Sequence, residues 1–258
     1  MAACLRLENV SKSFGVGGSA ETRAIDDITL EVEEGEFLAV VGPSGCGKST
    51  LLQIAAALIA PSRGKVRLDG LTISSPPPSM VYLFQQYAKS LFAWRTVVDN
   101  VAFAVEHHRT RAQARAHSHR FLEMVGLDEF AERYPWQLSG GMQQRVAIAR
   151  ALAAEPRVLL MDEPFSSVDA LTRLELHALV QDLRDKQRFT AVLVTHDVDE
   201  AVFLADRVVV LSARPARVVR SIAIGLPRPR DNIETREDPR FLALRHELLA
   251  MLLKKPDG

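Results

Sequence analysis

The feature that most constrains the fold of this chain is a glycine-rich run, Gly42-Pro-Ser-Gly-Cys-Gly-Lys-Ser-Thr50. The apolar run Phe37-Leu-Ala-Val-Val41 precedes it and is typical of a strand buried on both faces of a parallel sheet. The residues from Lys48 to Leu58 follow with a helical pattern. Strand, glycine loop and helix in this order match the phosphate-binding motif G-x-x-x-x-G-K-[ST] in its structural context. We therefore expect an α/β protein that binds a phosphate-bearing ligand here.

The residue types of this phosphate loop suit that ligand. Glycines let backbone N–H groups turn inward around phosphate oxygens, and the positive end of the next helix faces them. Lys48 is expected to reach the β- and γ-phosphates, and the Ser49 hydroxyl to bind Mg²⁺. The expected ligand contacts are the whole loop: Gly42, Pro43, Ser44, Gly45, Cys46, Gly47, Lys48, Ser49 and Thr50. A chance glycine-rich turn is the alternative, and the flanking strand and helix argue against it.

Cys46 lies inside the phosphate loop, near a helix N-terminus, where the pKa of a thiol tends to fall. The simplest interpretation is that it fills a variable position of the motif. We still expect a thiol alkylator to block ligand binding, and Cys46→Ala to abolish the block.

Strands and helices alternate along the rest of the chain, which predicts a parallel sheet covered on both faces. Short apolar runs predict buried strands at 81–84, 158–161 and 191–194, and a helix at 170–186 separates the last two. Near the N-terminus apolar and polar residues alternate, as in half-buried antiparallel strands: Leu5, Leu7 and Val10, then Ile28, Leu30 and Val32. A helical pattern occupies about 96–154, and an amphipathic helix with Phe241, Leu244, Leu248 and Leu252 on one face ends the chain.

Composition narrows the possible partners. The 258 residues carry 32 basic and 32 acidic side chains, so the basic excess typical of a nucleic-acid binder is missing and we expect no nucleic-acid partner. The sequence contains no run of about 20 apolar residues, as a membrane-spanning helix would need. Charges in Met1–Glu8 argue against a signal peptide, and the two cysteines form no disulfide framework. We expect a cytosolic chain whose membrane-spanning partner, if any, is another protein.

Two carboxylates follow the apolar strand Val158-Leu-Leu-Met161. Asp162 and Glu163 stand at the carboxyl end of a parallel strand, where side chains face a ligand crevice. Asp162 is expected to hold Mg²⁺ through water, and Glu163 to polarise an attacking water. An isolated Asp-Glu pair is common on surfaces, but this one accompanies a phosphate loop.

The run Leu138-Ser-Gly-Gly-Met-Gln-Gln-Arg145 resembles the signature sequence of the ATP-binding cassette (ABC) family. The resemblance implies a P-loop NTPase (RecA-like) α/β core with an N-terminal antiparallel β portion. It implies one domain over 1–258, with a helical subdomain at about 86–155 and a C-terminal extension at about 212–258. It also implies that two copies bind ATP and Mg²⁺ between them, the signature of one capping the γ-phosphate on the other through Ser139, Gly140, Gly141 and Gln143. The alternative for Ser139 is a helix N-cap without a ligand.

Further residues match the family by position. Gln85, rather than its neighbour Gln86, stands where a mobile glutamine contacts Mg²⁺ and the lytic water. Asp169 belongs to a run that resembles the loop reaching across the dimer. His196, in Val194-Thr-His-Asp197, matches a histidine that contacts the γ-phosphate. Phe14 matches the aromatic residue that stacks on adenine, and the alternative is a core phenylalanine.

The run Ser90-Leu-Phe-Ala-Trp-Arg-Thr-Val-Val-Asp-Asn-Val101 resembles nitrate, sulfonate and taurine importer subunits, with Ala93 where that branch often has proline. The resemblance implies an ATP hydrolase that energises import of such a solute. Its partners would be a second copy, membrane permease subunits and, indirectly, an extracytoplasmic binding protein. It would lie peripherally on the cytoplasmic face of the inner membrane. A soluble cassette ATPase and an exporter subunit are the alternatives, and the chain has neither a long insertion nor fused membrane helices.

A histidine cluster and a glutamate cluster in the sequence both predict solvated surface rather than a binding site. His107, His108, His117 and His119 alternate with arginines, which predicts a basic, solvated helical face rather than a metal site. The glutamates at 31, 33, 34 and 36 predict a solvated strand edge and turn.

Overall fold

A computed structural model of the chain describes residues 3–15, 22–85, 90–187 and 189–253. The chain forms two compact units. The first unit joins residues 1–77 to residues 188–258, and the second consists of residues 78–187. Within the described residues, no helix is both long and apolar enough to cross a membrane.

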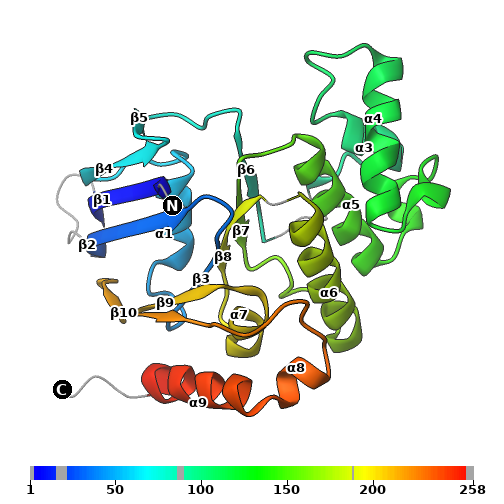
Figure 1. Cartoon of the computed structure of the whole chain (residues 1–258). Helices are drawn as coiled ribbons and strands as arrows, with labels where there is room; N and C mark the ends of the chain where they lie inside the picture. The colour runs from blue at the N-terminus through cyan, green and yellow to red at the C-terminus, as the bar shows by residue number, and fades with distance from the viewer. Residues whose placement is uncertain (1–2, 16–21, 86–89, 188, 254–258) are drawn as a thin grey trace. The chain divides into compact units, whose positions relative to one another are not determined.

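The first unit contains an antiparallel sheet with strand order β2-β1-β4-β5 (Figure 1). Its strands are β1 (Ala3–Phe14), β2 (Thr22–Glu33), β4 (Arg63–Leu68) and β5 (Leu71–Ile73). The predicted antiparallel alternation is confirmed, and the register of β1 against β2 shifts at several points. Asn9 has a φ of 49°, and the register of β1 against β2 shifts between Leu7 and Val10. This bulge explains how Val10 is buried although it stands at an odd spacing from Leu7.

The parallel strands of the first unit are β3 (Phe37–Val41), β8 (Thr190–Val194) and β9 (Arg207–Leu211). β3 pairs with both of the others in parallel, and β10 (Val218–Ala223) is antiparallel to β9. Every residue of β3 and β8 is buried, as their uninterrupted apolar runs predict. Helix α1 (Lys48–Ala55) follows β3 and is shorter than expected, because Ala57 adopts a φ of 54° that a helix cannot continue through.

Helix α7 (Val198–Leu204) follows β8, and α8 (Glu234–Glu237) leads into α9 (Pro239–Leu253). α9 packs alongside α7 (Figure 1). The predicted apolar face of this last helix is confirmed in part. Phe241 and Leu248 are fully buried, whereas Leu244 and Leu252 are only partly covered.

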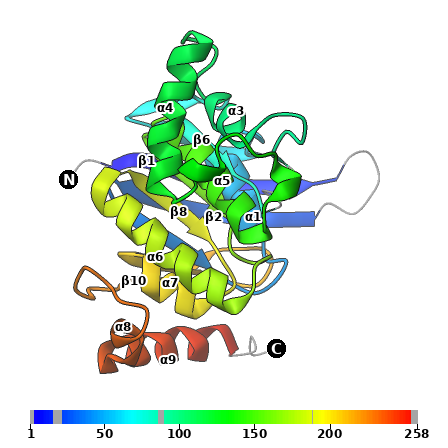
Figure 2. The same ribbon diagram turned by 90° about the vertical axis from the view of Figure 1, so that its right-hand side faces the viewer.

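In the second unit, β6 (Met80–Leu83) pairs in parallel with β7 (Val158–Asp162). Helices α3 (Val97–Ala102), α4 (Arg111–Met124) and α5 (Gly140–Ala153) pack on one another (Figure 2), and α6 (Ala170–Gln187) follows β7. The helical pattern expected over 96–154 is therefore broken into separate helices. Each begins at a hydroxyl side chain that caps it, from Thr96, Thr110 and Ser139 respectively.

Each of the two charged clusters departs from expectation only in part: His107, His108 and the glutamates at 31, 33 and 34 are exposed as predicted. His117 is buried and its Nε2 lies 2.9 Å from the Ala153 carbonyl oxygen, so it belongs to the packing of α4 rather than to a solvated face. His119 Nδ1 lies 2.6 Å from Asp128 Oδ1. Over the ranges the structure describes, no group of His, Cys, Asp or Glu side chains is arranged to hold a metal ion. Glu36 is also not a solvated edge residue, because its mostly buried carboxylate pairs with Arg207.

Candidate active site

The phosphate loop of the first unit has the backbone that phosphate binding requires. Gly45 has a φ of 72° and Gly47 a φ of 124°, in the region that side chains with a Cβ rarely adopt. A Cβ on Gly47 would lie only 3.1 Å from the Ala24 carbonyl oxygen. Gly47 is the N-cap of α1, and no side chain caps this helix start. An uncapped helix N-terminus that follows glycines of positive φ fits a polyphosphate such as that of ATP.

Lys48 lies beneath the loop and is 6% exposed. Its Nζ donates to the Gly42 carbonyl oxygen at 2.9 Å and to the Pro43 carbonyl oxygen at 3.1 Å. The ammonium group is therefore already held at the loop. Ser44, Gly45 and Ser49 are exposed, as expected of residues that meet a ligand from solvent.

Cys46 does not have the environment expected for it. The thiol is only 2% exposed, and burial raises its pKa above the ordinary value. The helix N-terminus does not outweigh the loss of solvation, so the thiol stays protonated near neutral pH. The expectation of a lowered thiol pKa was wrong.

His196 follows β8 and its side chain is exposed. The residues before and after it, Thr195 and Asp197, are both held by hydrogen bonds. Thr195 is buried and its hydroxyl donates to Glu200 Oε2 at 2.6 Å, while it accepts a hydrogen bond from the Asp197 backbone N–H at 3.0 Å. Asp197 caps α7 by accepting from the Glu200 N–H at 3.1 Å. The first turn of α7 thus positions the backbone that carries His196.

Phe14 ends β1 and is 47% exposed. The Lys12 ammonium lies 5.2 Å from the centre of its ring. Phe14 is therefore not part of the core, which excludes the alternative of a core phenylalanine. The ring remains accessible for stacking.

In the second unit, both acidic residues at the end of β7 have defined partners. The Tyr82 hydroxyl donates to Asp162 Oδ2 at 2.9 Å, and Asp162 is 8% exposed. Gln85 Nε2 donates to Glu163 Oε2 at 3.2 Å. The structure therefore brings the two predicted catalytic residues Gln85 and Glu163 together, and Gln86 lies outside the described residues. Carboxylate oxygens of this kind are suitable ligands for Mg²⁺.

The backbone at Glu163 is unusual. Its φ is 45°, in the left-handed region that non-glycine residues rarely adopt. Ser166 stabilises this turn, since its hydroxyl donates to the Glu163 carbonyl oxygen at 2.9 Å. The side chain of Gln144, fully buried in α5, donates to the Pro164 carbonyl oxygen. Strain of this type is concentrated at functional sites, where the surrounding structure holds it in place.

The signature residues begin α5. Ser139 is exposed, and its hydroxyl accepts a hydrogen bond from the Met142 N–H at 3.3 Å. Gly140 has open space around it, whereas a Cβ on Gly141 would lie 2.4 Å from Thr172 Cγ2. The Gln143 amide points back toward the preceding turn and donates to the carbonyl oxygens of Pro135 and Leu138. The helix start is thus capped and still presents an exposed hydroxyl.

Asp169 stands immediately before α6. It accepts from the Thr172 N–H at 3.0 Å and from the Thr172 hydroxyl at 2.7 Å. The backbone hydrogen bond from Thr172 lowers the pKa of this carboxyl, so it is ionised at neutral pH. Through Thr172, Asp169 and Gly141 are linked within the second unit.

Sequence reasoning missed three residues near these groups. Tyr82 holds Asp162, Gln144 holds the turn after Glu163, and Arg214 donates to the Gly45 carbonyl oxygen at 2.7 Å. Tyr82 could have been found from its place in a strand next to the expected acidic strand end. Nothing in the sequence near Gly45 indicates Arg214, which is far away along the chain.

Comparison with known proteins supports the resemblance. The family model described as "ABC transporter" matches residues 25–166. An uncharacterized ABC transporter ATP-binding protein of Methanocaldococcus jannaschii is 49% identical over 249 residues, covering 96% of this chain and 91% of that protein. The nitrate import ATP-binding protein NrtC of Synechococcus elongatus is 43% identical over 98% of this chain. The chain spans only 38% of the length of NrtC.

Solved structures confirm the α/β cassette fold. A dimeric bacterial ABC transporter cassette matches with a TM-score of 0.74 at 33% identity, covering 85% of this chain and 98% of that one. The same cassette in a dimeric post-hydrolysis state, bound to ADP and Pi, matches with a TM-score of 0.73 at 32% identity over the same shares. The predictions of the fold class and of the family are therefore confirmed, and the chain belongs to the ATP-binding proteins of the ABC transporter family.

Proposed function

We propose that the chain is the ATP-hydrolysing subunit of a membrane importer for a small solute with an anionic or zwitterionic head. The observation that carries the ATPase part is the phosphate loop, with left-handed glycines and an uncapped α1 start. The importer part is supported by the 43% identity to NrtC and to the bicarbonate transport protein CmpC of Synechococcus elongatus. Nitrate, sulfonate, taurine and bicarbonate share one property, a small anionic or zwitterionic head, so the solute class is proposed at that level.

The proposed division of roles follows the chemistry of each group. The phosphate loop and Lys48 bind the phosphates, and Phe14 stacks on adenine. Asp162, Ser49 and Gln85 supply oxygen ligands for Mg²⁺, which neutralises charge on the phosphates when bound. Glu163 accepts a proton from the attacking water, and His196 orients that water or carries a proton.

Two copies of the chain are proposed to share each ATP. The signature residues Ser139, Gly140 and Gly141 and the neighbouring Asp169 would act on the nucleotide held by the other copy. Support comes from the exposed Ser139 hydroxyl at the start of α5 and from the dimeric cassettes that the chain resembles. In this proposal, residues 1–258 form a single ABC ATPase domain.

A membrane permease is the proposed partner on the second unit. An open cavity of about 810 Å³ lies there, and its lining includes the exposed aromatic residues Trp94 and Tyr134. Charged side chains of both signs complete its wall: Arg95, Asp99, Glu106, Arg109 and Arg111. A cavity lined by exposed aromatic residues and by charges of both signs suits a short amphipathic segment of another protein. Docking of this kind would place the chain at the cytoplasmic face of the inner membrane.

The experiment is a pull-down of the tagged Glu163→Gln variant from native membranes, extracted with ATP and mild detergent. We expect an integral membrane protein in equal amount, which identifies the permease. Lys48→Ala is the matched control, because it should not hold ATP and should release a partner that depends on the closed dimer. Recovery of a ribosome, of DNA or of no partner would contradict transport and leave the ATPase part intact. A permease fused to export machinery would contradict only the direction.

A further inference from the structure

Residues 212–217, called the strap here, connect β9 to β10 and cross from the phosphate loop to β2 within the first unit. At one point the strap contacts the phosphate loop directly. Arg214 is exposed, and its Nη2 donates to the Gly45 carbonyl oxygen at 2.7 Å. No role in the cassette mechanism assigned above uses this contact.

The strap is fixed to β2 by a short ladder. The Ala216 N–H donates to the Ala24 carbonyl oxygen at 2.9 Å, and the Asp26 N–H donates to the Ala216 carbonyl oxygen at 2.9 Å. The strap also closes on itself, because the Arg217 N–H donates to the Ser212 hydroxyl at 3.0 Å. Its backbone is therefore held on both sides of Arg214.

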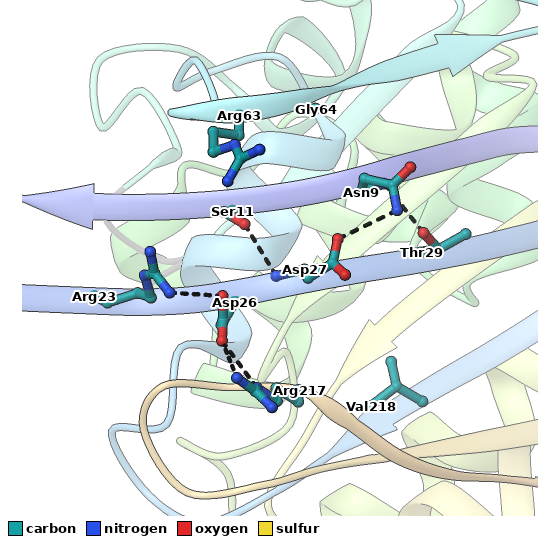
Figure 3. Close-up of a pocket in the computed structure, with 10 residues that line it drawn as sticks. All are labelled: Asn9, Ser11, Arg23, Asp26, Asp27, Thr29, Arg63, Gly64, Arg217 and Val218. Carbon is teal, nitrogen blue, oxygen red and sulfur yellow. Dashed lines mark hydrogen bonds and ion pairs between the residues drawn. The ribbon is translucent and has the colours of Figure 1, made fainter.

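An ion pair fastens the end of the strap (Figure 3). Arg217 Nε donates to Asp26 Oδ2 at 2.9 Å, and Arg23 Nη1 lies 2.9 Å from Asp26 Oδ1. Asp26 is 8% exposed, and the hydrogen bond from Arg217 lowers the pKa of its carboxyl. At neutral pH the carboxylate is ionised and binds both arginines.

The ladder and Arg214 act on the same loop. The Ala24 carbonyl oxygen accepts a hydrogen bond from the strap. The same oxygen would lie 3.1 Å from a Cβ placed on Gly47, so it is next to that glycine. Arg214 holds Gly45, two residues earlier. The strap thus bonds to the phosphate loop at Gly45, and the β2 residue to which it bonds lies against Gly47; both glycines have positive φ.

The Gly45 contact has a direct consequence for the ligand. The Gly45 carbonyl and the Cys46 N–H belong to one peptide plane and point in opposite directions. Arg214 binds the carbonyl, while the Cys46 N–H bonds to the Pro43 carbonyl oxygen at 3.2 Å. Both ends of this peptide are therefore restrained. A loop that is ordered before binding loses less conformational entropy when phosphates arrive.

We propose that Arg214 is a positioning residue that pre-orders the phosphate loop and thereby sets the affinity for nucleotide. This inference rests on the proposed function of the phosphate loop in binding ATP. Arg214 does not take part in the hydrolytic step, so it acts on binding and not on chemistry. The guanidinium also adds positive charge beside the loop, which strengthens the binding of a negatively charged polyphosphate.

The test compares the full-length chain with Arg214→Ala, Arg214→Lys and Arg220→Ala. Arg220 is the matched control, an exposed arginine of β10 that pairs with Glu247 and not with the phosphate loop. The affinity for Mg-ATP is measured with a fluorescent ATP analogue, and KM and kcat are measured by phosphate release. Arg214→Ala should raise Kd and KM about three- to tenfold, the effect of one exposed, charge-assisted hydrogen bond, with kcat nearly unchanged. Arg214→Lys should recover part of the affinity, and Arg220→Ala should match the parent chain.

Three results would overturn this role for Arg214. They are an unchanged Kd in Arg214→Ala, a fall in kcat at unchanged KM, and an equal loss of affinity in Arg220→Ala. Thermal unfolding without nucleotide separates a folding defect from a loop effect, because a positioning role predicts weaker binding at an unchanged Tm. Failure of the parent chain to bind ATP would instead contradict the proposed function.

Discussion

Gln85 donates a hydrogen bond to Glu163 across 3.2 Å, and the two residues stand 78 positions apart in the sequence. A neutral amide beside the carboxylate can orient it without competing for protons. The pair therefore gives Glu163 a fixed direction while leaving it able to accept a proton from water.

Gln85→Glu should move the pH dependence of hydrolysis to higher pH. Two carboxylates at this distance cannot both ionise easily, so the pair holds a proton to higher pH than one carboxylate does, and the rate should reach its plateau at higher pH. The measurement is kcat against pH for the parent chain and the variant, with Gln85→Ala as the control that removes the amide without adding charge. An identical pH profile in Gln85→Glu would show that the two side chains do not interact during turnover.

Ser139→Asp separates the two interpretations of the signature serine. Aspartate is as good an N-cap as serine, so α5 should keep its stability and the Tm should be unchanged. A carboxylate facing a γ-phosphate should nevertheless abolish most ATP hydrolysis, because like charges repel. Ser139→Ala is the control and should lose about 1 kcal/mol of unfolding free energy with the cap. Normal hydrolysis by Ser139→Asp would show that Ser139 acts only as a helix cap.

The local motifs of this chain were predictable from its sequence, and the contacts that support them were not. The phosphate loop, the acidic end of β7 and the capped start of α5 depend on consecutive residues, and the structure has each of them where it was expected. The Arg214 contact joins residues 169 positions apart, and no local pattern indicates it.

Two departures show where local patterns fail. The left-handed backbone of Glu163 is stabilised by Ser166 of the same turn and by Gln144 of α5, which contacts the next residue, and propensity alone would not place a glutamate there. His117 is interleaved with arginines that suggest solvent, yet helix packing in the second unit buries it against Ala153. In both cases tertiary contacts outweigh the preference of the residue itself.

Arg230→Ala should lower the free energy of unfolding by about 2–4 kcal/mol, since several buried charge-assisted hydrogen bonds are lost together. Arg230 is 7% exposed and donates to the Phe203 and Ala205 carbonyl oxygens, both at 2.8 Å, at the C-terminal end of α7. The last carbonyl oxygens of a helix generally lack donors within their own helix, and a cation also suits the negative end of the helix dipole. The measurement is urea denaturation, with the exposed Arg220→Ala as the control. A loss below about 0.5 kcal/mol, as for an ordinary surface residue, would contradict the capping role.

Cys46 should react slowly with iodoacetamide at pH 7 in the folded chain. Its thiol is buried and its pKa is raised, so the reactive thiolate is scarce at neutral pH and becomes more abundant as the pH rises above the usual thiol value of about 8.5. Mass spectrometry of the labelled peptide at pH 7 and pH 9.5 measures this, with urea-unfolded protein as the reference. Once alkylated, the loop should no longer bind ATP, and Cys46→Ala should be insensitive. Rapid labelling at pH 7 would mean that the loop opens often.

The most direct test of the central claim is the oligomeric state of Glu163→Gln with and without Mg-ATP, measured by light scattering after gel filtration. The variant keeps the shape of the side chain and removes the base, so ATP should bind and remain uncleaved. For Glu163→Gln we expect a monomer without nucleotide and, with ATP, a dimer that retains two nucleotides. Phosphate release should be at least about 100-fold slower than in the parent chain. Normal hydrolysis by Glu163→Gln, or ATP binding without any dimer, would contradict the central claim.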